Sequence, residues 1–246
     1  MSYSDTNPIY NDLINDWNFY RTSYEGGRNW AQYQSSTGGQ LSDRNLWQHL
    51  RESQDDYQLR LNRAVYPNYC RTIVDVYRDF IYGNDTTIAR EIEADNIDQF
   101  LLNVDQRHNT IDDFMKRAAI YAQIYGFCGV FVDAPMVDQE IFTLRDQQEL
   151  GLQPYFAIYT APDICDWALN RTGDLEWIRV KETNYGNRGP FDEEAEQQTY
   201  YRTWTREEWF VHDADEQLVA TGSQPLGQVP FVPVYFQRHP SKEFVG

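Results

Sequence analysis

The 246-residue sequence has little cysteine, and its three cysteines, Cys70, Cys128 and Cys165, are widely spaced with no C-x-x-C pair. An odd number at such spacing argues against a disulfide framework or a cysteine metal site. Their apolar neighbours favour small core residues instead. The four histidines include no two at metal-ligand spacing. No apolar run is long enough to span a membrane, so we expect a soluble protein made in a reducing cytosol.

Positive charge is also scarce. Lys and Arg number 21 against 38 Asp and Glu, which gives a formal net charge of −17. This balance argues against a protein that grips nucleic acid through phosphate contacts, because such contacts need clustered basic residues. It leaves open a surface that nucleic acid slides past. Four arginines on two expected helices, Arg60, Arg63, Arg71 and Arg78, lie beside Asp and Glu, and we predict surface ion pairs there.

Catalytic motifs are missing as well. The sequence contains no G-x-S-x-G, P-loop or G-x-G-x-x-G pattern, and we predict no catalytic, cofactor-binding or metal-binding residues. Asp133, at the end of an expected strand, is the best single candidate for a catalytic carboxylate, with Asp163 or Asp166 as its second acid. The alternative interpretation is an Asp that terminates the strand and pairs with a backbone amide.

Two acidic runs, 192–194 and 213–216, have the composition of a divalent-cation site. As flanks of solvated turns they need no cation, and we favour that interpretation.

Aromatic residues are plentiful, at 15% of the chain with 18 Tyr and 7 Trp. They indicate a large aromatic core, or aromatic side chains at subunit interfaces, where Tyr and Trp are enriched. A third possibility is a carbohydrate- or protein-binding module that uses four exposed tryptophans as stacking platforms: Trp167, Trp177, Trp204 and Trp209. Alternating aromatics in strands are more typical of a core.

The centre of the chain is the stretch 109–135, NTIDDFMKRAAIYAQIYGFCGVFVDAP. Thr110 is the expected N-cap, with Asp113 as its capping-box partner. The apolar spacing predicts a helix with one apolar face, ended by Gly126 at the C′ position. The continuous run 127–132 predicts a strand covered on both sides. We interpret this unit as the junction between a helical first half and a β-rich second half.

The remaining pattern predicts helices over 8–24, 52–64, 68–82 and 98–104, with loops over 31–43, 136–153 and 184–196. The apolar face of the third helix comprises Tyr69, Ile73, Val76, Tyr77 and Phe80, and that of the first comprises Leu13, Trp17, Tyr20 and Tyr24. Strands are predicted over 155–159, 175–182, 198–205, 209–213, 217–221 and 231–236. This order indicates an α+β fold, a helical N-terminal half packed on a mostly antiparallel β-rich C-terminal half. We divide it into parts 1–135 and 136–246.

Several of these features follow one another in a recognisable order. They are the helix with Trp17, Tyr20, Arg21 and Tyr24 before Gly26 and Gly27; LRLNRAVYPNYCRTIVDVY at 59–77; FLLNVD at 100–105; FVDAP at 131–135; PYFAIYTAPDICDW at 154–167; and VPFVPVY at 229–235. Together they resemble the N-terminal part of tailed-bacteriophage portal proteins. The resemblance spans most of the chain and lies in order and spacing, since no single motif is diagnostic.

The resemblance implies the wing domain of a portal subunit, up to the first stem helix. The family's stem, clip and crown would lie beyond Gly246, so the chain corresponds to part of a portal or to a shorter relative. Portal subunits form a homo-oligomeric ring, a dodecamer, at one capsid vertex. Double-stranded DNA passes through its channel during packaging and ejection without sequence-specific binding. The implied partners are the major capsid protein, the terminase large subunit and head-completion or adaptor proteins. The implied location is the virion, after synthesis in the host bacterial cytoplasm, with no membrane contact.

The sequence therefore supports three hypotheses about function. The first is a structural ring subunit without catalytic activity or cofactor. The second is an α+β enzyme that uses Asp133, and the third is an aromatic-rich binding module.

Overall fold

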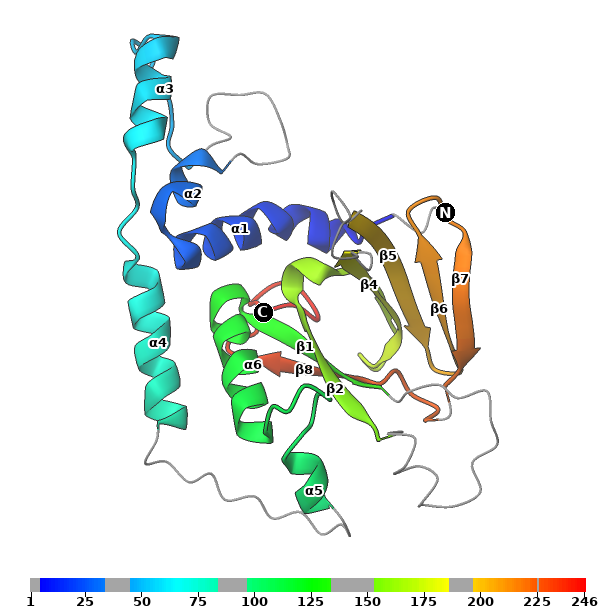
Figure 1. Cartoon of the computed structure of the whole chain (residues 1–246). Coiled ribbons are helices and arrows are strands. Elements are labelled where there is room, and N and C mark those ends of the chain that lie inside the picture. Colours follow the sequence, from blue (N-terminus) through cyan, green and yellow to red (C-terminus); the bar gives the residue numbers. More distant parts are fainter. Residues whose placement is uncertain (1–4, 34–44, 84–96, 134–152, 186–196, 225) are drawn as a thin grey trace, which may run out of the picture. The chain divides into compact units, whose positions relative to one another are not determined.

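The computed structural model describes residues 5–33, 45–83, 97–133, 153–185, 197–224 and 226–246. The chain has an α+β fold, with its helices in the N-terminal half and its antiparallel strands in the C-terminal half (Figure 1). It forms two compact units, each built from separated segments. Unit 1 comprises Met1–Asn11, Val104–His108 and Cys128–Pro233, and unit 2 comprises Asp12–Asn103, Asn109–Phe127 and Val234–Gly246. One crossing between the units thus falls between Phe127 and Cys128, whereas the predicted division into 1–135 and 136–246 stays a prediction.

The described helices are α1 Pro8–Glu25, α2 Gly27–Gln32, α3 Gln54–Arg63, α4 Tyr69–Tyr82, α5 Ile97–Leu101 and α6 Ile111–Tyr125. Five of them confirm predicted helices to within a few residues. The exception is α2, because Gly26 ends α1 with φ 67° and a new helix starts directly at Gly27. The loop predicted from residue 31 therefore begins two residues later, after Gln32. Most of each of the three predicted loops, 31–43, 136–153 and 184–196, lies outside the described residues.

The central helix α6 forms as its sequence predicts. The hydroxyl of Thr110 accepts a hydrogen bond from the Asp113 amide (3.3 Å) and donates one to the Asp113 carboxylate (2.9 Å). Gly126 has φ 88°, a conformation that favours glycine at the C′ position. The chain then enters strand β1, Phe127–Asp133, whose first five residues are buried. The expected helix-to-strand unit is confirmed.

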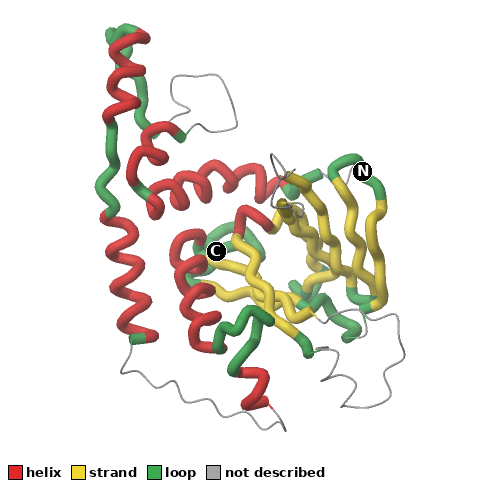
Figure 2. The backbone as a smooth tube through the Cα atoms, viewed as in Figure 1, coloured by secondary structure: helices red, strands yellow, loops and turns green. Residues whose placement is uncertain are grey.

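The described strands form two sheets. The strands are β1, β2 Tyr155–Thr160, β3 Ile164–Leu169, β4 Leu175–Tyr185, β5 Gln197–Thr205, β6 Glu208–Asp213, β7 Leu218–Ser223 and β8 Phe231–Tyr235. A three-stranded sheet has the order β2-β1-β8, and a five-stranded antiparallel sheet has the order β3-β4-β5-β6-β7 (Figure 2). Strand β3 is the one described strand that the sequence pattern did not predict. It follows a single 3-10 turn at Ala161–Asp163, and its pairing with β4 carries two register shifts.

Aromatic side chains join the two sheets within unit 1. Phe131 of β1 stacks on Trp204 of β5, with ring centroids 4.2 Å apart, and packs edge-on against Tyr159 and Phe231 at 5.0 Å each. Gly129 makes room for this cluster, because a Cβ atom there would lie 2.1 Å from Cε2 of Phe231. The surplus of aromatics therefore contributes to a core in unit 1.

Unit 2 has its own aromatic cluster around Phe127, which contacts Trp17, Tyr235 and Phe244 at centroid distances of 6.0–6.2 Å. On α1 the predicted face is only partly correct: Leu13 and Trp17 are buried, but Tyr20 is 46% exposed. In the described residues, no helix is long and apolar enough to cross a membrane.

Candidate functional site

Unit 1 contains a charged cluster centred on Arg202 of β5. Its Nε lies 3.1 Å from Glu182 Oε1 on β4, and its Nη1 lies 3.7 Å from Asp133 Oδ2 at the end of β1. The guanidinium carbon also lies 5.5 Å from the Trp204 ring centroid and 5.9 Å from that of Trp209. Arg202, Glu182 and Trp204 share one face of the five-stranded sheet, since Val180 pairs with Arg202 and Ile178 with Trp204.

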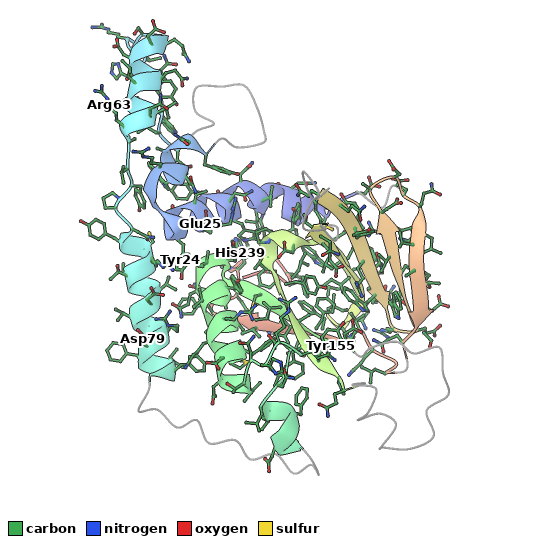
Figure 3. The ribbon with its side chains drawn as sticks, viewed as in Figure 1. Tyr24, Glu25, Arg63, Asp79, Tyr155 and His239 are labelled. Atoms are coloured by element: carbon green, nitrogen blue, oxygen red, sulfur yellow. The ribbon has the colours of Figure 1, made fainter. Side chains whose placement is uncertain are left out.

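Two tyrosines of β2 complete what we call the Arg202 cluster (Arg202, Glu182, Asp133, Tyr155 and Tyr159). Tyr155 donates its hydroxyl hydrogen to Asp133 Oδ2 at 3.0 Å, and Tyr159 donates to Glu182 Oε1. Burial, reinforced by the Asp133 charge, raises the pKa of Tyr155 to about 12. Burial and the Glu182 charge raise the pKa of Tyr159 as well. Both phenols therefore stay protonated at neutral pH and act as hydrogen-bond donors. Figure 3 labels Tyr155 on β2.

The cluster is arranged to hold two sheets together. Burial alone would lower the pKa of Arg202, but the nearby Glu182, Tyr159 and Asp133 outweigh it, so the pKa is raised and the guanidinium is charged. One cation thus lies between two carboxylates, and two phenols donate to those carboxylates. Removing one partner of such an ion pair destabilises the fold strongly, because the other charge stays partly desolvated.

The enzyme hypothesis required Asp133 to act with Asp163 or Asp166. The structure gives the three carboxylates different partners. Asp163 accepts a hydrogen bond from the Thr160 amide at 2.9 Å and so caps the 3-10 turn. Asp166 pairs with Arg179 at 3.6 Å. Asp133 instead joins Tyr155 and Arg202, two residues that the sequence analysis did not select. Neither of the named second acids belongs to the Arg202 cluster.

The four tryptophans of the binding-module hypothesis are not exposed platforms. Trp167 and Trp204 are buried, at 6% and 2% exposure. Trp177 and Trp209 are half-buried, and arginines lie over their faces: Arg179 at 5.4 Å from the Trp177 centroid and Arg202 at 5.9 Å from that of Trp209. The favoured interpretation of alternating aromatics as core residues is confirmed for Trp167 and Trp204, because strand alternation directs both into the core.

The acidic run 213–216 forms a turn. Asp213 Oδ1 accepts hydrogen bonds from the amides of Asp215 (3.0 Å) and Gln217 (2.8 Å), which ties its carboxylate to its own hairpin. The run 192–194 lies outside the described residues. Among the residues that the structure does describe, no group of three or more Asp, Glu, His or Cys side chains could hold a metal ion.

The cysteines behave as the sequence predicts for two of the three. Cys128 and Cys165 are buried, and burial raises the pKa of the Cys128 thiol to about 12 and that of the Cys165 thiol to about 11. Cys70 is only half-buried, and its sulfur lies 3.6 Å from the Tyr66 hydroxyl. The two buried thiols are therefore protonated core side chains.

Unit 2 holds the most unusual surface. Helix α4 has no buried residue, although its apolar side chains follow a helical spacing. We name the five residues of its predicted apolar face the α4 stripe: Tyr69, Ile73, Val76, Tyr77 and Phe80. Their exposed fractions run from 47% at Val76 to 80% at Phe80. This apolar face does not pack into the core, because α4 turns a different side inward: Val74, Arg78 and Tyr82 on that side are half-buried.

Specific contacts hold α4 in this orientation. The Asn68 side chain caps α4 by accepting from the Arg71 amide, and its Nδ2 donates to the carbonyls of Tyr24 (2.7 Å) and Glu25 (3.0 Å) at the end of α1. The Arg71 guanidinium lies over the Tyr24 ring, 5.5 Å from its centroid. Figure 3 labels Tyr24 and Glu25 near the start of α4.

The connection before α4 is equally anchored. Gly27 and Tyr66 exchange two backbone hydrogen bonds of 3.0 Å each, and the rings of Trp30 and Tyr66 stack at 4.5 Å. Outward exposure of the stripe is thus a consequence of a fixed attachment.

The predicted ion pairs on α3 and α4 are confirmed for three of the four arginines. Arg60 pairs with Glu52 at 2.7 Å, Arg71 with Asp75 at 3.7 Å, and Arg78 with Asp75 and Asp79 at 2.9 and 2.8 Å.

A cavity of about 700 Å³ lies between the end of α4 and helix α6. Its lining includes Arg78, Lys116 and Arg117 together with Asp79 and Asp113. Arg78 pairs with Asp79, and Lys116 lies 3.8 Å from Asp113. Two of the three basic side chains in the lining therefore pair with its two acidic side chains.

The sequence signal for the Arg202 cluster was available but weak: an arginine inside an aromatic strand segment, YYRTW at 200–204. The outward face of α4 had no local signal. Comparisons of the sequence with models of known protein families and with curated proteins gave no match.

Proposed function

We propose that this chain is the wing region of a tailed-bacteriophage portal subunit, a structural protein without catalytic activity. In this role it assembles with copies of itself into a ring at a capsid vertex, for which the family implies twelve subunits. The ring surrounds the channel for packaging and ejection of double-stranded DNA. It also provides docking surfaces for the terminase large subunit, head-completion proteins and the major capsid protein. The proposal places the protein in the virion.

The observation that carries the proposal is the α4 stripe. The five side chains of this face are 47–80% exposed on a 14-residue helix that is capped and bonded to α1, and an apolar patch of this kind marks an interaction site. An assembly subunit supplies such a partner. The ordered resemblance in the sequence favours the portal family among assembly proteins.

The charge of the chain is compatible with this role. A net charge of −17 disfavours tight phosphate contacts, and each such contact would add a salt-sensitive force holding DNA. A protein surface that DNA must move past works best with few phosphate contacts.

Native mass spectrometry and negative-stain imaging of the chain test the proposal. We expect a closed ring with a central hole and a mass that is an integral multiple of the 29.1 kDa chain. A monomer at all concentrations up to about 100 μM would contradict the proposal, because ring contacts of standard size hold well below that concentration.

The enzyme hypothesis makes a different prediction about Asp133. Under our proposal, Asp133→Asn keeps the ring, because Asn can still accept from Tyr155 and the Glu182–Arg202 pair remains. If that change abolished the biological function while the ring and the fold stayed intact, the enzyme hypothesis would be favoured.

A further inference from the structure

We infer that the α4 stripe is one side of the contact between neighbouring copies of this chain. The inference rests on the proposed homo-oligomer and adds the location of its interface. The stripe is formed by Tyr69, Ile73, Val76, Tyr77 and Phe80. All five belong to α4, the helix labelled in Figure 1.

The size of the stripe matches an interface better than an ordinary surface. Its five side chains expose on the order of 600 Å². The largest apolar patch of a typical monomer is about 300–600 Å², and it is often functional. A stable interface covers about 800 Å² on each partner. Ile81, on the same helix, is a further apolar side chain that is 49% exposed.

The spacing of the stripe suits a packed helix face. Positions 69, 73, 76 and 80 follow steps of four, three and four, so these side chains form a single row along α4. Rows of this kind pack into the groove of another element with interdigitating side chains. Scattered surface apolar residues do not show this regularity.

The charge distribution favours the arm as the place where two copies of this acidic chain meet. We call residues 45–83, which contain α3 and α4, the arm. The arm carries five basic residues, Arg51, Arg60, Arg63, Arg71 and Arg78, and five acidic residues, Glu52, Asp55, Asp56, Asp75 and Asp79. The arm is therefore neutral, and the net charge of −17 belongs entirely to the rest of the chain.

This distribution decides where two copies can meet. Two acidic bodies repel each other, and like charges brought together at an interface cost several kcal/mol. A neutral arm carries no such penalty, either against another arm or against the acidic body of a neighbour. In a ring each copy uses two different surfaces, so the stripe meets a different part of the next copy. A pair of stripes facing each other would instead close as a dimer.

The test compares two double variants of the 246-residue chain. Ile73→Glu with Phe80→Glu places two carboxylates in the stripe. Leu218→Glu with Val219→Glu on β7 adds the same charge at two side chains that are each 55% exposed, outside the arm. Because Ile73 and Phe80 are 58% and 80% exposed in the single chain, we expect both variants to keep their circular dichroism spectrum and melting temperature.

Assembly is measured by native mass spectrometry and by light scattering on a size-exclusion column, over a range of protein concentrations. We expect the stripe variant to need at least a hundredfold higher concentration for half-assembly, because burial of two apolar side chains is lost. We expect the β7 variant to change this concentration less than fivefold. Hydrogen exchange of the α4 amides should slow in the assembled wild-type chain and stay fast in the stripe variant.

The outcomes separate this inference from the ring itself. A ring that survives the stripe substitutions overturns the inference and leaves the proposed function in place. A wild-type dimer that dissociates in the stripe variant supports the inference and overturns the ring. If the β7 variant dissociates to the same extent, the stripe is not the specific contact. A wild-type chain that stays monomeric overturns the inference. This holds whether the chain itself protects the α4 amides from hydrogen exchange or leaves the stripe available to a different protein.

Discussion

Replacing Arg202 by Met tests the interpretation of the Arg202 cluster as the electrostatic connection between the two sheets of unit 1. Methionine keeps an unbranched side chain of similar length between Trp204 and Trp209, so the packing changes little. The substitution removes the cation that lies between Glu182 and Asp133. The expected loss therefore comes from two carboxylates left without their common partner.

The magnitude follows from the burial of the pair. An exposed ion pair contributes about 0–1 kcal/mol, and breaking a fully buried pair costs about 3–5 kcal/mol. The Arg202 and Glu182 side chains are 27% and 15% exposed, so we place the cost between these limits, at about 2–3 kcal/mol. With a urea dependence of about 2–3 kcal/mol per molar, the midpoint should fall by roughly 1 M.

Urea unfolding followed by tryptophan fluorescence measures the effect, with Arg21→Met as the matched control. Arg21 pairs with Glu25 at 3.4 Å on α1, with both side chains more than 40% exposed, so its replacement should cost about 0.3–0.5 kcal/mol. Adding Glu182→Gln to Arg202→Met should recover part of the loss, because one of the unpaired charges is removed. Equal midpoints for the Arg202 and Arg21 variants would refute the reasoning, since burial would then make no difference.

Three further predictions concern local structure. Gly129→Ala should destabilise the fold by about 1–3 kcal/mol in thermal unfolding, because its Cβ would lie 2.1 Å from the Phe231 ring. Adding Phe231→Leu to Gly129→Ala should recover part of this loss, and an unchanged melting temperature of the Gly129→Ala variant would exclude the clash. Asn68→Ala should lower the free energy of unfolding by about 1–2 kcal/mol and speed hydrogen exchange at the start of α4. The reason is that the Asn68 side chain both caps this helix and holds it to α1. Unchanged exchange would show that other contacts suffice to hold the start of α4. The Arg60 hydrogen bond lowers the pKa of Glu52 from 4.5 to about 2, so this pair stabilises the fold at neutral pH and loses its contribution as the pH falls through that interval. Arg60→Met should return the Glu52 pKa toward 4.5 in a carboxyl NMR titration, and a value that stays near 2 would assign the shift to another cause.

The elements of the fold were largely predictable because their signals are local. Thr110 and Gly126 bound α6 as capping chemistry requires, and the uninterrupted apolar run after Gly126 forms the buried strand β1. Alternating apolar and polar residues located β4 to β8 to within a few residues. The missed elements, α2 and β3, are each six residues long. Helix α2 begins at the second glycine of the pair Gly26-Gly27, and β3 follows directly on a single 3-10 turn. Short segments of this kind carry too few residues for a periodicity to be visible.

The candidate site was less predictable, because its partners come from distant parts of the chain. Asp133 was selected from its place after a buried strand. Its actual partners, Tyr155 and Arg202, are 22 and 69 residues away, and strand order and register alone bring them together. The proposed second acids, Asp163 and Asp166, have other partners, because hydrogen bonding directs one to its own turn and an ion pair directs the other to Arg179.

By itself, then, the sequence determined the α+β class, the acidic character and most element boundaries, because these depend on composition, periodicity and end-capping within a few residues. The tertiary structure alone decided which faces are covered. An amphipathic period specifies that α4 has an apolar side, but the Asn68 and Arg71 contacts with the end of α1 decide that this side points outward. Likewise, strand alternation specifies that Arg202 and Trp204 share a face, but sheet pairing decides that the face meets Asp133 and Phe131. A face becomes buried only when a second surface packs against it, and the fold of the whole chain determines which surface that is.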